Sequence, residues 1–115
     1  MEEREEERNQ QPPRREEAEI AEYITEIIYE YISRELGDDF FEAEIEVAFR
    51  GNSVEVSVDA GASPLVEDER LNRIVERAAE LGVVIADMIK EGVIKPGDDK
   101  RRVLKEALRR LGEST

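Results

Sequence analysis

The sequence contains no cysteine, no histidine and no tryptophan. Without cysteine there are no disulfides and no thiolate nucleophile, and without cysteine or histidine the usual ligands of zinc and iron are missing. The chain also lacks an imidazole that could act as a general base near neutral pH. No P-loop and no glycine-rich dinucleotide-binding pattern occurs either. We therefore expect no enzymatic activity, no cofactor and no metal site.

Long hydrophobic runs are absent as well. No stretch approaches the roughly 20 consecutive apolar residues that cross a bilayer, and residues 1–8 are highly charged, which is the opposite of a signal peptide. These features predict a cytoplasmic protein with no membrane association. A composition rich in glutamate and arginine but free of cysteine and histidine also suits a thermophile, where surface ion-pair networks are commoner.

Acidic charge is what the sequence has in excess. The 115 residues include 30 acidic and 17 basic side chains, which gives a formal net charge of −13. The 39% of hydrophobic residues suffices for one modest core, and the length is typical of a single domain. The charge is unevenly distributed, because residues 16–46 carry −11 whereas residues 95–115 carry +3. An acidic N-terminal half is therefore followed by one basic C-terminal segment.

Residues 1–15 have a composition unlike the rest of the chain. They include five glutamates, four arginines and two prolines, and no aliphatic residue follows Met1. Such a segment has nothing to bury. We predict a disordered charged tail over residues 1–15 and a single domain over residues 16–112.

Three segments show the three- and four-residue spacing of apolar side chains that is typical of amphipathic helices. The first, residues 16–36, is rich in isoleucine and glutamate and ends before Gly37. The second, residues 67–91, contains Gly82 in its interior, which costs about 1 kcal/mol relative to alanine, so we expect another backbone to approach it closely. The third, residues 98–111, is short and basic.

Residues 42–60 change to the two-residue period of β-strands. Gly51-Asn52 lies between two alternating runs and suits a type II′ hairpin turn. If Arg50 pairs with Ser53, every apolar residue of one run faces an apolar residue of the other. The predicted pairs are Phe49 with Val54, Val47 with Val56, Ile45 with Val58 and Ala43 with Ala60. The sequence thus predicts an α+β fold of αββα(α) order, a two-layer domain in which helices cover one face of an antiparallel hairpin.

A two-stranded hairpin leaves two open edges, and it is marginally stable alone. Two copies that pair their hairpins edge to edge would form a four-stranded sheet about a two-fold axis. We therefore predict a homodimer. The alternative is a monomer whose edges are protected by charge and short length.

The polar face of the hairpin is the candidate interaction surface. Its carboxylates are Glu44, Glu46, Glu55 and Asp59. Tyr29 falls off the apolar stripe of the first helix, so we expect it to be exposed and include it as an interface candidate. Clustered carboxylates can bind a divalent cation or act as acid and base. Here, however, their spacing is simply that of alternate strand positions, which favours a solvated face.

The last predicted helix carries a candidate basic patch. Its members are Lys100, Arg101, Arg102, Lys105, Arg109 and Arg110. Because the acidic field of the whole chain repels phosphates, nucleic-acid binding by the body of the domain is disfavoured. The basic helix also lacks interleaved aromatic residues. We expect it to neutralise the acidic helix of its own chain or of a neighbouring subunit, and a local nucleic-acid patch is the alternative.

Four segments follow one another between about residues 18 and 91, and their order is the basis of a resemblance. They are a glutamate-rich helix, an acidic hairpin, Ser63-Pro64-Leu65, and a helix that opens with Asp68-Glu69-Arg70-Leu71. This order resembles a small archaeal family of unknown function with αββα topology, whose genes often lie beside that of the prefoldin beta subunit. The resemblance implies an archaeal, cytoplasmic origin and transfers no catalytic residue.

These observations favour a non-enzymatic protein-interaction module whose acidic surface binds a basic protein partner. Two alternatives are a nucleic-acid-associated protein that uses the basic C-terminal helix, and a small metal binder or enzyme built on the hairpin carboxylates.

Overall fold

The computed structural model describes residues 14–112, which form three α-helices, one short 3₁₀ turn and two strands. The elements are α2 (Arg15–Leu36), η1 (Gly37–Asp39), β1 (Phe40–Arg50), β2 (Ser53–Ala62), α3 (Asp68–Lys90) and α4 (Lys100–Arg110). This order and the antiparallel sheet confirm the predicted α+β fold. The first helix begins one residue earlier than predicted, and residues 1–13 of the predicted tail lie outside the described residues.

α2 is an amphipathic helix whose buried residues recur at helical spacing. They are Tyr23, Ile24, Ile27, Ile28, Tyr31, Ile32 and Leu36. At the first turn, the backbone N–H of Arg14 donates a 3.1 Å hydrogen bond to Oε1 of Glu17. That bond satisfies a donor that the helix itself leaves free. Because so many β-branched residues lower its intrinsic helix propensity, α2 depends on tertiary packing for its stability.

The hairpin has the register that the sequence predicts. All four apolar pairs are observed, for example Val47 opposite Val56, and Arg50 lies opposite Ser53. Gly51 has a φ of 61° and no non-glycine residue between 14 and 112 has a positive φ, which fits the predicted type II′ turn. Both strands extend beyond the predicted hairpin. A bulge at Phe41 explains why the alternating pattern was not recognised there.

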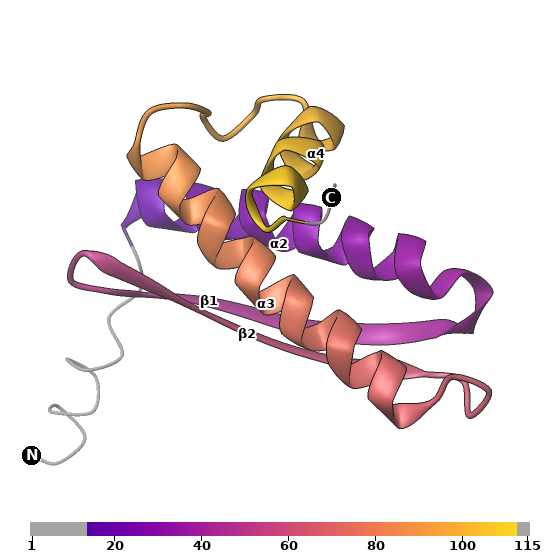
Figure 1. Ribbon diagram of the computed structural model, residues 1–115. Helices are drawn as coiled ribbons and strands as arrows, with labels where there is room; N and C mark the ends of the chain where they lie inside the picture. The colour runs from indigo at the N-terminus through magenta and orange to yellow at the C-terminus, as the bar shows by residue number, and fades with distance from the viewer. Residues whose placement is uncertain (1–13, 113–115) are drawn as a thin grey trace, which may run out of the picture.

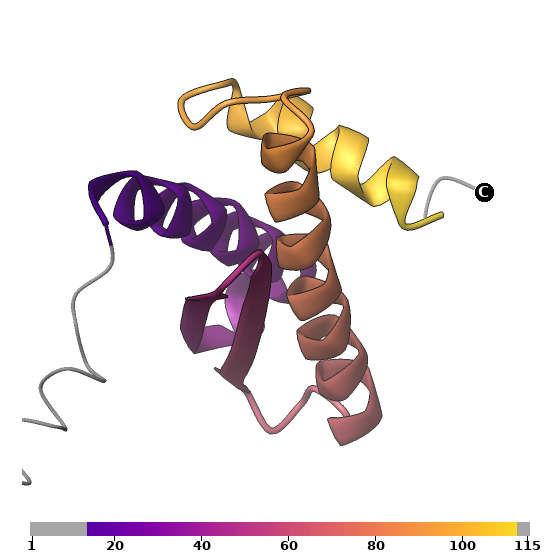
Figure 2. The ribbon, with the colours of Figure 1, turned by 90° about the vertical axis from the view of Figure 1, so that its left-hand side faces the viewer.

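The two long helices lie between the hairpin and the last helix (Figure 1). α2 and α3 cross each other and cover one face of the hairpin, as predicted, whereas α4 packs on the side of the helix pair that faces away from the strands (Figure 2). The apolar strand residues, such as Ile45 and Val56, pack against this helical core and are half-buried. The opposite face of the hairpin has no covering element among residues 14–112.

Gly82 lies where α3 packs against both α2 and β2. A Cβ atom at this position would lie 2.8 Å from Cδ1 of Ile28 and 2.8 Å from Cγ1 of Val56. The expectation that another backbone approaches Gly82 is therefore wrong. Two branched side chains fill the space instead, because they are the groups that project from α2 and β2 into the core.

α4 begins two residues later than predicted, because the two aspartates before it have different roles. Asp99 caps the helix, since its side chain accepts a 3.0 Å hydrogen bond from the backbone N–H of Arg101. Asp98 belongs to the preceding turn, where its Oδ2 accepts a 3.0 Å hydrogen bond from the backbone N–H of Lys95. The buried face of α4 consists of Val103, Leu104 and Ala107.

Candidate interaction surfaces

One face of the hairpin points away from the helices (Figure 2). Its exposed residues are mostly acidic. We call it the acidic ribbon face, and its carboxylates belong to Glu42, Glu44, Glu46, Glu55 and Asp59, all of them exposed. The strand alternation fixes this arrangement, because the residues between them pack against α2 and α3. The structure therefore places the four carboxylates predicted from the sequence on one surface.

Along the acidic ribbon face, some carboxylates directly oppose one another. Glu44 is the cross-strand partner of Asp59, and like charges at directly opposite positions destabilise a sheet. Glu55 is compensated by an ion pair with Arg50 near the turn. Within residues 14–112, neither Glu44 nor Glu46 forms an ion pair. The middle of the ribbon thus keeps uncompensated negative charge.

An open hollow of about 340 Å³ lies at the middle of the hairpin. It is lined by Glu44, Ile45, Glu46, Ser57, Val58 and Asp59. In the part of the chain that the structure describes, no group of three or more carboxylates is placed to hold a metal ion. The geometry therefore gives no support to the metal-binding alternative.

Tyr29 lies apart from the acidic ribbon face. Its side chain is 47% exposed, as predicted, and it projects from α2. Its ring packs edge-to-face on Phe40, with ring centroids 5.2 Å apart and an interplanar angle of 74°. Tyr29 therefore covers the start of β1, and it does not extend the acidic surface.

The predicted basic patch on α4 mostly faces acidic groups of its own chain. Lys100 Nζ lies 3.0 Å from Oε1 of Glu26 on α2, and Arg110 lies 3.1 Å from Oε1 of Glu91. Two further pairs are within or beside α4, namely Arg102 with Asp98 at 3.8 Å and Arg109 with Glu106. Four of the six basic residues are thus paired with acidic groups of the same chain, and one of them, Lys100, reaches α2. Among residues 14–112, Arg101 and Lys105 form no ion pair.

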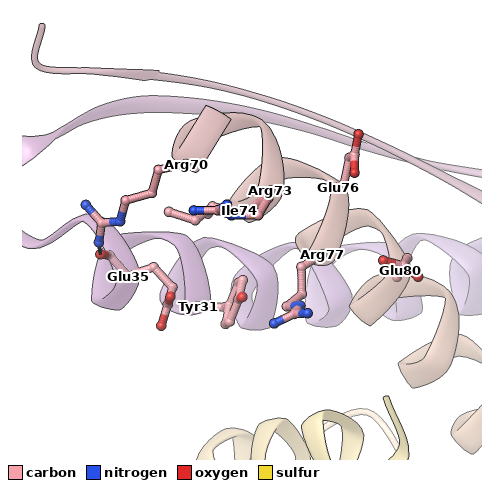
Figure 3. A pocket seen from close by; sticks show the side chains of 8 residues that line it. All are labelled: Tyr31, Glu35, Arg70, Arg73, Ile74, Glu76, Arg77 and Glu80. Atoms are coloured by element: carbon pink, nitrogen blue, oxygen red, sulfur yellow. Dashed lines mark hydrogen bonds between the residues drawn. The ribbon is translucent and has the colours of Figure 1, made fainter. Parts of the chain in front are cut away.

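Sequence reasoning missed a groove of about 250 Å³ between the C-terminal half of α2 and the N-terminal half of α3 (Figure 3). Its lining residues are Tyr31, Glu35, Arg70, Arg73, Ile74, Glu76, Arg77 and Glu80. The net charge of each segment does not reveal the three arginines, because neighbouring acidic residues on α3 cancel their charge. Their spacing of three and four residues was the available signal, since such positions share one helix face.

The phenol of Tyr31 forms part of this groove. Its pKa is raised to about 12, mainly because burial disfavours the charged form and secondarily because of the negative charge of Glu35. The positive charge of Arg77 lowers the pKa of Tyr31 and offsets part of this rise. The hydroxyl group is therefore protonated at neutral pH and can donate a hydrogen bond.

Comparison with models of known protein families, with curated proteins and with solved structures gives no match for this chain. The resemblance to an archaeal αββα family therefore stays a prediction. Between residues 14 and 112, none of the helices has the length and apolar character needed to span a membrane.

Proposed function

We propose that this chain is a non-enzymatic protein-interaction module whose acidic ribbon face binds a basic segment of a protein partner. The observation that carries the proposal is the direct opposition of Glu44 and Asp59, beside an equally uncompensated Glu46. A stretch that only had to be stable would gain from opposite charges at these positions. A cationic partner would remove the repulsion on binding.

The spacing of the carboxylates indicates which basic segment would fit. Glu42, Glu44 and Glu46 lie at alternate positions of β1, so neighbouring members are about 7 Å apart along the strand. An extended peptide with lysine at every second position repeats its charges at the same interval. We infer an extended lysine- or arginine-bearing segment as the ligand, in preference to a basic helix.

A calorimetric titration with synthetic peptides tests this proposal. One peptide alternates lysine with serine, and a second has the same composition with its lysines clustered in one block. We expect the alternating peptide to bind more tightly, and we expect its affinity to fall with added salt because the contacts are exposed ion pairs. Replacing Glu44 and Glu46 together by glutamine should weaken it about fivefold, given roughly 0.5 kcal/mol for each lost pair.

The control is a variant with the same change in net charge at another site. Glu19→Gln combined with Glu22→Gln removes two exposed carboxylates of α2 and leaves the acidic ribbon face intact. Equal weakening by the two double variants would show that only total charge matters, and it would contradict the proposal.

We also propose that two copies associate through their hairpins. The sheet of the described residues has two strands, so the outer edges of β1 and β2 have no strand beside them. Edge-to-edge pairing would bring two acidic ribbon faces side by side, so salt should strengthen this association and weaken binding of the basic peptide. Light scattering at micromolar concentration and two salt levels tests it, and a monomeric mass throughout would refute the homodimer.

The archaeal, thermophilic and cytoplasmic assignments belong to the same proposal. They are supported by the charge-rich composition without cysteine and histidine, and by the resemblance of the αββα segment.

A further inference from the structure

The groove between α2 and α3 contains a nearly buried phenol that has no hydrogen-bond partner among residues 14–112. Tyr31 is only 5% exposed, and within residues 14–112 its hydroxyl forms no hydrogen bond. Every fully enclosed side-chain oxygen among residues 14–112 has a hydrogen-bond partner. Because the Tyr31 hydroxyl has none, it is not fully enclosed, and it opens into the groove that Tyr31 lines. A ligand atom that accepts a hydrogen bond from this hydroxyl would supply the missing partner.

Arginines of α3 line the same groove as this hydroxyl. Figure 3 shows Arg70 and Arg77 on either side of Tyr31. The guanidinium of Arg70 donates a 2.8 Å hydrogen bond to the backbone carbonyl of Glu35, which anchors the side chain at the groove and leaves further N–H donors available. Arg73, one turn later on α3, forms no hydrogen bond or ion pair with the described residues. The groove therefore offers guanidinium and phenol donors together.

The carboxylates of the groove limit the charge that a ligand can carry. Glu35 is close enough to Tyr31 to contribute to its raised pKa, and Glu76 and Glu80 also line the groove. The three carboxylates balance the three arginines that line the groove, so the lining carries no net positive charge that would favour a dianion over a monoanion. Planar carboxylates also match the fork of an arginine side chain, which can donate two parallel hydrogen bonds.

We propose that this groove binds the carboxylate of a small monoanionic molecule, with Arg70, Arg73 and Tyr31 as the hydrogen-bond donors. In the unliganded protein, solvent water reaches the phenol through the groove. A carboxylate oxygen replaces that water without loss of the hydrogen bond, whereas an apolar ligand would not. This inference is independent of the proposed acidic ribbon face, because the groove lies between the two helices.

The test is a nuclear magnetic resonance titration of the full chain with acetate, at constant ionic strength maintained by chloride. We expect saturable shifts of the side-chain Nε–Hε signals of Arg70 and Arg73 and of the Tyr31 ring. Tyr31→Phe keeps the ring and removes the hydroxyl, and it should weaken acetate binding about 3- to 10-fold, the value of one hydrogen bond. Tyr29→Phe, at an exposed tyrosine outside the groove, should leave binding unchanged.

Arg73→Gln provides a second variant that does not disturb the core, because Arg73 is exposed. It should weaken acetate binding at least as much as Tyr31→Phe, whereas Arg34→Gln, an exposed arginine outside the groove, should have no effect. Shifts that do not saturate, or equal effects of Arg73→Gln and Arg34→Gln, would overturn the proposal. Tighter binding of inorganic phosphate than of acetate would also overturn the assignment to a monoanionic carboxylate.

Discussion

The hydroxyl of Tyr23 donates a 2.8 Å hydrogen bond to the backbone carbonyl of Asp98, across a separation of 75 residues. This contact joins α2 to the turn that precedes α4. The carboxylate of Asp98 holds the same turn, since it accepts from the backbone N–H of Lys95. Burial raises the pKa of Tyr23, and the charge of Asp98 adds to this effect, so the phenol remains a donor at neutral pH.

Tyr23→Phe should lower the free energy of unfolding by about 1 kcal/mol, because a part-buried carbonyl loses its donor while the ring packing persists. Urea denaturation followed by circular dichroism measures the change. Tyr29→Phe is the matched control, since that side chain is half exposed and its hydroxyl forms no hydrogen bond with the described residues. An equal effect of both variants would show that the contact with Asp98 contributes nothing.

The attachment of α4 should depend on its apolar face more than on its ion pairs. Leu104 is 3% exposed, so Leu104→Ala should destabilise the protein by about 2 to 5 kcal/mol through lost burial and a residual cavity. Lys100→Gln removes the exposed pair with Glu26 and should cost less than about 1 kcal/mol. Thermal unfolding of both variants tests the ranking, and a larger effect of Lys100→Gln would contradict it.

Gly82→Ala should destabilise the protein although alanine favours helices. The gain in helix propensity is about 1 kcal/mol, but the added Cβ would lie 2.8 Å from atoms of Ile28 and Val56, and such overpacking costs about 1 to 3 kcal/mol. Chemical denaturation measures the net effect. Adding Val56→Ala removes one of the colliding side chains, so Gly82→Ala should be less harmful in that background. A stabilising effect of Gly82→Ala alone would show that the space is not constrained.

Alkaline pH should weaken the fold through Tyr31. Its pKa is about 12 in the folded protein against an ordinary value of 10.0, so the unfolded chain releases this proton first. The contribution of the protonated phenol to stability is therefore complete below pH 10. It declines as the pH rises toward 12, by about 1.4 kcal/mol for each pH unit. Urea midpoints measured across this range should fall, and the decline should be shallower in Tyr31→Phe. Parallel declines in both proteins would contradict the assignment.

The register of the hairpin could be predicted from the local sequence pattern alone. Alternation along each strand and Gly51 at the turn are sufficient to predict every apolar pair, because a register shifted by one residue would move the apolar side chains to the solvent face. The same alternation placed Glu44 and Asp59 on one surface. The bulge at Phe41 was missed, because an extra residue breaks the period on which the prediction depends.

The three helices, the hairpin register and the separation of acidic from basic charge follow from the order of residues along the chain, since each depends on local spacing. Local spacing does not predict that α4 packs against α2 and α3 of the same chain, or that Ile28 and Val56 fill the space beside Gly82; these contacts arise when the elements pack together. The groove also depends on tertiary packing, because Tyr31 and Arg73 lie far apart in sequence and line one groove only when the two helices cross. Periodicity specifies the face that a helix buries, whereas the packing of several such faces specifies which side chains become neighbours.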